Sequence, residues 1–121
     1  WEAVDSLGPD RIGHGTSAGR DPELLKRLAA DRITVECCLT SNIHTGAIDR
    51  YEDHPLPKFL DAGVLVALCT DNPTVSSTNL RREYEIAMET FGFSEDDMRK
   101  IASMSWEASF LSGIGSWPAA L

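Results

Sequence analysis

The sequence predicts an α/β fold built on parallel strands, and three observations carry that prediction. The run Val64–Thr70 is apolar apart from its last residue and lies between Gly63 and Pro73. An uninterrupted run of this kind is typical of a strand buried on both faces of a parallel sheet. A second run, Ile33–Leu39, is β-branched and apolar apart from Glu36, and a helical pattern separates the two. Strands that alternate with helices indicate right-handed βαβ units.

The segments before the second strand follow the same order. Gly8-Pro9 is a turn signal after a short helical segment, and the first strand is expected over residues 10–14. Asp21 followed by Pro22 predicts an N-cap with proline at the first helical position. The apolar spacing that follows predicts a helix over residues 21–30 that packs against the sheet.

After the second strand, polar Thr40–Asn42 is expected to end the strand, and residues 43–54 read as a loop. Helices are predicted at 55–62, 76–90 and 94–111, around the third strand at 64–70, and Ser94 with Asp97 forms a capping box. The buried faces of the last two helices are expected at Leu80, Tyr84, Ala87, Met88 and Phe91, and at Met98, Ile101, Ser105, Ala108 and Leu111. We expect a domain over residues 1–112 and a loop-like tail over 113–121.

Three parallel strands cannot close a barrel, and they leave two unpaired edges. A complete (β/α)₈ barrel typically needs ~250 residues, about twice the length of this chain. The strand pattern therefore predicts either a small open sheet or less than half of a barrel. Because the chain begins at Trp1 without an initiator Met, we expect it to be a piece of a longer protein.

Composition limits the classes of partner. The formal charge of -8 repels a phosphate backbone, so no nucleic-acid partner is expected. No apolar run approaches the ~20 residues of a membrane span, and no membrane partner is expected. The three cysteines, an odd number with two of them adjacent, predict reduced thiols rather than a disulfide framework, and a cytoplasmic location.

Two residues at strand ends are candidates for chemistry. His14 follows the first strand and Asp71 follows the third, and the carboxyl ends of parallel strands share one rim. An imidazole beside a metal-holding carboxylate is the pairing expected for the activation of water. The alternatives are ordinary: Asp71-Asn72-Pro73 is also turn chemistry, and a histidine between glycines often satisfies only a local hydrogen bond.

Other polar residues are expected to be structural. Glu36, inside an apolar strand, is interpreted as a paired carboxylate. Ser41 and Asn42 are interpreted as residues that cap the backbone at the end of the strand, with a place on the rim as the alternative. We expect His44 and His54 at the surface. Cys69 has the same strand parity as Asp71 and is interpreted as packing rather than as a nucleophile.

Four segments in order, Arg11–Gly15, Glu36–Asn42, Thr70–Pro73 and Trp106–Leu111, resemble the C-terminal part of the adenosine deaminase family. The resemblance covers about residues 1–112. It implies the last three β/α units of a TIM-type (β/α)₈ barrel, with a zinc hydrolase site at the open end that deaminates purine nucleosides.

The resemblance also implies roles for three residues. The histidine that matches His14 orients and deprotonates the attacking water, and the aspartate that matches Asp71 is a catalytic zinc ligand. The residue that matches Asn72 hydrogen-bonds the purine ring of the substrate.

Two departures from the family pattern limit the expectation. The family often has a second aspartate where this chain has Asn72, so substrates other than adenosine, such as adenine, AMP or a modified nucleoside, stay open. The remaining zinc ligands belong to an absent N-terminal part, and Asp71 alone cannot hold zinc. We therefore expect the isolated chain to be inactive and either to self-associate or to pair with the missing part; the alternative is a non-catalytic α/β module.

Overall fold

A three-stranded parallel sheet forms the centre of the protein, as predicted. The computed structural model describes residues 1–111 of the chain. The strands are β1 (Arg11–Gly13), β2 (Thr34–Cys37) and β3 (Val66–Leu68), in the order β1-β2-β3. In the register of the sheet Ile12 lies beside Val35, and Val35 lies beside Val66. Each strand is shorter than the segment predicted for it.

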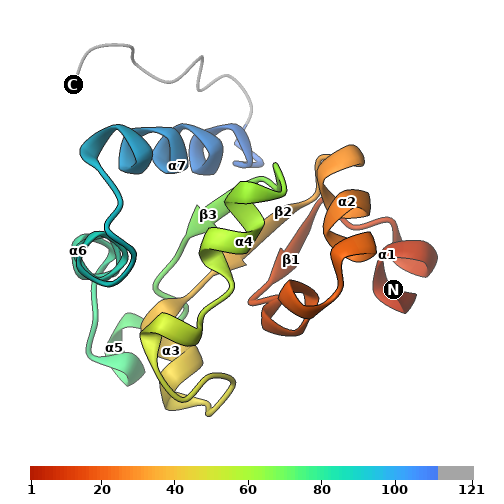
Figure 1. Cartoon of the computed structure of the whole chain (residues 1–121). Coiled ribbons are helices and arrows are strands. Elements are labelled where there is room, and N and C mark those ends of the chain that lie inside the picture. Colours follow the sequence, from red (N-terminus) through yellow and green to blue (C-terminus); the bar gives the residue numbers. More distant parts are fainter. Residues whose placement is uncertain (112–121) are drawn as a thin grey trace.

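Helices surround the sheet (Figure 1). They are α1 (Glu2–Leu7), the 3-10 helix η1 (Thr16–Arg20), α2 (Pro22–Ala30), α3 (Leu39–His44), the 3-10 helix η2 (Tyr51–Asp53), α4 (Leu56–Asp61), α5 (Pro73–Ser76), α6 (Leu80–Phe91) and α7 (Glu95–Glu107). In Figure 1, α2 and α4 cover one face of the sheet, α7 lies beside β3, and α3 and α5 lie together at one end of the strands.

The core lies between the sheet and the helices on that face. Leu28 of α2 and Phe59 of α4 are fully buried with Val35 and Val66 of the sheet. Complete burial of one such side chain contributes about 1.5–3 kcal/mol. The helix starts follow the predicted caps: Asp21 accepts hydrogen bonds from the backbone N–H groups of residues 23 and 24, and Ser94 and Asp97 form the reciprocal capping box.

The segment after the second strand differs in part from the prediction: residues 45–50 are loop as expected, but helices occupy both sides of them. Residues 39–44 form helix α3 and residues 51–53 form η2, so the chain turns into a helix immediately after Cys38. Thr40, Ser41 and Asn42 therefore lie on the first turns of a helix instead of at the end of a strand. All three are buried.

Two helix boundaries also differ. The helix predicted over 76–90 is divided, because Ser77 adopts a left-handed backbone (φ 49°) and Asn79 caps a new helix that begins at Leu80. Leu80 is exposed and Glu83 is fully buried, which reverses the expected face at the start of α6. The helix predicted to residue 111 ends at Glu107, and Leu111 is exposed.

The last two expectations concern the C-terminal tail and membrane-spanning helices. The expected tail, 113–121, lies outside the described residues. Within residues 1–111, no helix is long and apolar enough to cross a membrane.

Candidate active site at the carboxyl ends of the strands

The structure brings His14 and Asp71 together at the carboxyl ends of the strands. Nε2 of His14 lies 3.9 Å from Oδ2 of Asp71, and both side chains are nearly half exposed. Both residues have left-handed backbones, with φ 63° at His14 and φ 58° at Asp71. Such conformations are uncommon outside glycine and cost energy, and they cluster at functional sites.

His14 donates two hydrogen bonds that fix its position, one from the backbone and one from the imidazole ring. Its backbone N–H donates to the carbonyl oxygen of Glu36 (2.8 Å), and its Nδ1–H donates to Oδ1 of Asn42 (2.8 Å). Because Nδ1 carries the proton, the neutral imidazole has its lone pair on Nε2, which faces Asp71. The basic nitrogen, Nε2, therefore lies beside Asp71 at the carboxyl ends of the strands.

Asp71 is oriented from the neighbouring strand connection. The hydroxyl of Ser41 donates to Oδ2 of Asp71 at 2.7 Å. No residue within 1–111 donates a hydrogen bond to Oδ1 of Asp71, and the side chain is nearly half exposed. One fixed and one open oxygen suit a carboxylate that binds a ligand from outside this part of the chain.

The amide oxygen of Asn72 caps helix α5 in the turn after β3. Its Oδ1 accepts the backbone N–H of Val75 (3.1 Å) and caps α5, as the turn interpretation predicts. The side chain is exposed. Within residues 1–111 its Nδ2 makes no hydrogen bond and can donate to a bound molecule.

Sequence reasoning missed His54 as a neighbour of this site, and it favoured a backbone-capping role for Ser41 and Asn42. Predicted at the surface, His54 is only 3% exposed; His44 is exposed as predicted. The backbone N–H of Leu56 donates to Nδ1 of His54 (3.0 Å), and Nε2 lies 3.4 Å from Nδ2 of Asn42. Burial lowers the pKa of His54 to about 4, and the nearby charge of His14 adds to this effect. The one signal in the sequence was the run of three polar residues directly after an apolar strand.

The interpretation of Glu36 as a paired carboxylate is confirmed. Its Oε1 lies 3.1 Å from Nε of Arg11, on the neighbouring strand. The guanidinium of Arg11 also lies over the ring of Phe110, 3.9 Å from the ring centroid. This ion pair joins β1 to β2.

The cysteines are free thiols, as predicted. Burial raises the pKa of Cys37. A hydrogen bond from the thiol of Cys38 to Cys69 raises the pKa of Cys38 and lowers that of Cys69. Cys69 is half-buried and its thiol also points at the carbonyl of Ala67, which fits a packing role.

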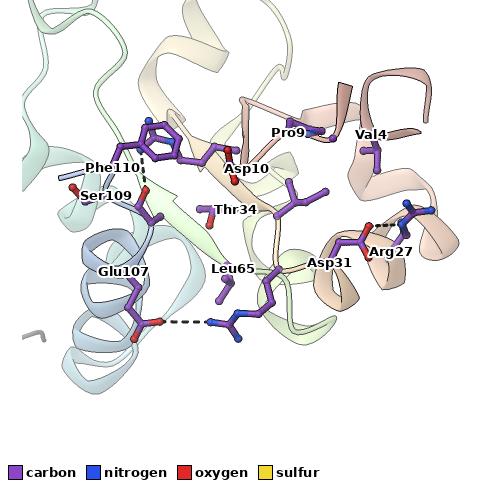
Figure 2. A pocket seen from close by; sticks show the side chains of 15 residues that line it. Val4, Pro9, Asp10, Arg27, Asp31, Thr34, Leu65, Glu107, Ser109 and Phe110 are labelled. Carbon is purple, nitrogen blue, oxygen red and sulfur yellow. Dashed lines mark hydrogen bonds and ion pairs between the residues drawn. The ribbon is translucent and has the colours of Figure 1, made fainter. Parts of the chain in front are cut away.

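A separate cavity of about 450 Å³ lies at the opposite, amino ends of the strands (Figure 2). Figure 2 shows Thr34, Leu65 and Phe110 among the residues around it. Three arginines line this cavity, and each is already in an ion pair: Arg11 with Glu36, Arg27 with Asp31 and Asp5, and Arg32 with Glu107. Paired cations at the end away from His14 do not indicate a second anion site.

The donor set fits part of a metal site. Within the described residues no three His, Cys, Asp or Glu side chains are grouped so that they could hold a metal ion. Asp71, with one open carboxylate oxygen, has the chemistry of a single ligand, and zinc takes three or four from the protein. The other ligands of any such centre must come from outside residues 1–111.

Comparison with known proteins identifies the family. The sequence profile described as adenosine deaminase matches residues 1–115. This chain belongs to the adenosine deaminase family. Among curated members, the adenosine deaminases of Shewanella loihica and Vibrio parahaemolyticus are 43% and 45% identical to it over 112 residues. That alignment covers 93% of this chain and 34% of each relative, so the chain spans about a third of the length of these deaminases.

Solved structures agree with a barrel fragment. Adenine deaminase from Arthrobacter aurescens has a TM-score of 0.86 and 31% identity, and N6-methyl-AMP deaminase from Arabidopsis thaliana has 0.80 and 35%. An amidohydrolase from Burkholderia ambifaria, solved with bound Zn, has 0.81 and 26%. These matches cover 93% of this chain and 34%, 33% and 32% of the three structures, respectively. The predicted fold class, the C-terminal β/α units of a TIM-type barrel, is confirmed.

Proposed function

We propose that the protein to which this chain belongs is a zinc-dependent aminohydrolase that converts adenosine or a related purine nucleoside to the inosine-type product. The observation that carries the proposal is the placement of Nε2 of His14 3.9 Å from Oδ2 of Asp71 at the carboxyl edge of the sheet. Family membership supports the reaction class. The domain assignment of residues 1–112 to a deaminase barrel is part of the same proposal.

In this proposal Asp71 is one zinc ligand and the others come from the N-terminal part of the protein. Zinc, when bound, makes water more acidic and neutralises developing negative charge. The hydrogen bond from Ser41 fixes Oδ2 of Asp71, which limits the carboxylate to one orientation toward a ligand. The Burkholderia amidohydrolase solved with bound Zn supports this choice of metal.

His14 is proposed as the general base. Its Nδ1–H is held by Asn42, so the proton of the attacking water is taken up at Nε2, on the side of Asp71. The imidazolium that results stands beside a carboxylate, which stabilises its charge. Return of that proton to the amino group lets the amino group leave as ammonia, while the oxygen of the water stays on the ring carbon.

Asn72 is proposed to contact the purine. One lone pair of its Oδ1 accepts the N–H of Val75, and in this proposal the amide meets the substrate through Nδ2, which can only donate. A ring nitrogen with a lone pair is the matching acceptor. Since adenine, adenosine and adenylates all offer such a nitrogen, Asn72 favours the aminopurine class without selecting one member.

Two substitutions in the full-length protein test the roles. Asp71→Ala is expected to abolish zinc binding and turnover, whereas His14→Ala keeps stoichiometric zinc and loses most of its turnover of adenosine. The exposed residues Asp61 and His44 provide matched controls, and alanine at either leaves both quantities unchanged. Metal analysis and ammonia release are the measurements, and equal zinc loss in the two site variants would show that the roles are wrongly assigned.

Asn72→Ala is expected to raise KM for the purine or lower kcat. An unchanged pair of constants would refute the contact. A substrate panel of adenosine, adenine, AMP and N6-methyl-AMP separates the members of the class. A full-length protein with no zinc and no ammonia release from any of them would favour the non-catalytic module.

A further inference from the structure

Glu83 is a fully buried carboxylate that the proposed reaction does not use. It lies on α6, and no ion pair joins it to a cation within residues 1–111. Burial of a charge without compensation is costly, so its hydrogen bonds must supply the compensation. Their partners show which parts of the molecule the carboxylate holds.

The first partner is Thr40, which gives two hydrogen bonds. Its backbone N–H donates to Oε2 of Glu83 (3.1 Å) and its hydroxyl donates to Oε1 (2.5 Å). Helix α3 begins beside Thr40, and its N-cap residue, Cys38, makes no side-chain capping bond. Glu83, 43 residues further along the chain, therefore satisfies a backbone donor that the start of α3 leaves open.

The second partner is Thr78, in the connection that follows the third strand. Its hydroxyl donates to Oε1 of Glu83 (2.7 Å), and its backbone N–H donates to the carbonyl of Pro73 (3.2 Å). Pro73 comes directly after Asp71 and Asn72. One buried carboxylate thus joins the two connections that carry the site.

The residues beside Thr40 give this link its consequence. Ser41 binds Asp71 and Asn42 binds His14, through hydrogen bonds of 2.7 and 2.8 Å. Hydrogen bonds of this length tolerate displacements of a few tenths of an ångström. A shift of Thr40 would therefore disturb the orientation of both site residues at once.

We propose that Glu83 is a positioning residue that holds the Thr40–Asn42 segment against the connection after Asp71 and so keeps His14 and Asp71 in register. The geometric part stands on the hydrogen bonds alone, while its effect on catalysis rests on the proposed deaminase function. Glu83→Gln keeps the volume but turns an N–H₂ group toward donors, which is a mismatch.

Hydrogen exchange on the full-length protein tests the geometric part. In Glu83→Gln, peptides that cover α3 are expected to exchange up to about tenfold faster, the loss that one or two hydrogen bonds produce. Peptides that cover α2 are expected to exchange at the wild-type rate. Glu89→Gln, an exposed position on the same helix, is the matched control and should change neither. Unchanged exchange at α3, or equal acceleration at α2 and α3, would overturn the proposal.

Zinc affinity and steady-state kinetics test the functional part. Loss of such an outer partner is expected to lower zinc affinity or kcat by about 10–100-fold, with little change in KM. A larger change in KM than in kcat would contradict a role through His14 and Asp71. If Glu83→Gln does not fold, Thr40→Val, which removes one donor and keeps the volume, should show a smaller effect of the same kind at α3. A wild-type protein that neither binds zinc nor deaminates refutes the proposed function, and the exchange result then decides the geometric part by itself.

Discussion

Acid should destabilise this fold through His54. Burial lowers the pKa of His54 to about 4, whereas the ordinary value in an unfolded chain is 6.5. Between pH 6.5 and about 4, His54 is therefore largely protonated in the unfolded state and largely neutral in the folded state. The stability that the neutral imidazole gives is complete above pH 6.5 and is lost progressively as the pH falls toward about 4.

The size of the loss follows from the gap between the two pKa values. At ~1.4 kcal/mol for each pH unit, the gap corresponds to a loss of about 3 kcal/mol in the free energy of unfolding. The structural reason is specific: Nδ1 accepts the N–H of Leu56, so a proton on Nδ1 would face another donor. A loss of about 3 kcal/mol is a large part of the stability of a small domain.

Urea unfolding between pH 7 and pH 4.5, followed by circular dichroism on the full-length protein, measures the effect. His54→Gln removes the titrating group, so its free energy of unfolding should fall less steeply over this range than that of the wild type. His44→Gln is the matched control, because His44 is exposed, and it should keep the wild-type slope. Equal slopes for wild type and His54→Gln would refute the assignment of the acid sensitivity to His54.

Two further predictions concern the backbone beside the site and the chain by itself. Gly15→Ala is expected to lower the free energy of unfolding by about 1–3 kcal/mol, because Gly15 has φ 57° and a Cβ there would lie 2.9 Å from Val35. Gly46→Ala shares the positive φ (71°) but meets no atom within 4 Å, so it should cost less; equal losses in thermal unfolding would show that contact with Val35 does not matter. The isolated 121 residues are expected to bind no zinc tightly, to deaminate nothing, and to self-associate, because a single ligand and two open strand edges are present. Zinc titration, ammonia release and light scattering test this, and zinc-dependent turnover or a monodisperse monomer would contradict it.

The local signals in the sequence located most of the scaffold. Apolar runs located the second and third strands, the turn signal Gly8-Pro9 preceded the first, and Asp21 with Pro22 and Ser94 with Asp97 marked two helix starts. These signals are local, since a cap is satisfied by the next few residues and a buried strand is apolar wherever it pairs. The order of strand-end residues was enough to indicate the family and to select His14 and Asp71 as a pair.

Other outcomes depended on partners far along the chain. The residues Thr40–Asn42 carry no strong helix signal, yet they lie in helix α3. The backbone N–H of Thr40, in the first turn, donates a hydrogen bond to Glu83, which is 43 residues away. His54 precedes a proline in a polar segment, which suggests a surface residue, yet it is buried beside Asn42.

The sequence by itself determined the α/β class, the strand positions, the family and the pair His14 and Asp71. Only the tertiary structure showed how that pair is held: Ser41 donates to Asp71 and Asn42 accepts from His14, and the buried Glu83 binds Thr40 beside them. The physical reason is that a polar side chain is buried only where its hydrogen bonds are satisfied, and here the satisfying groups come from other connections of the fold.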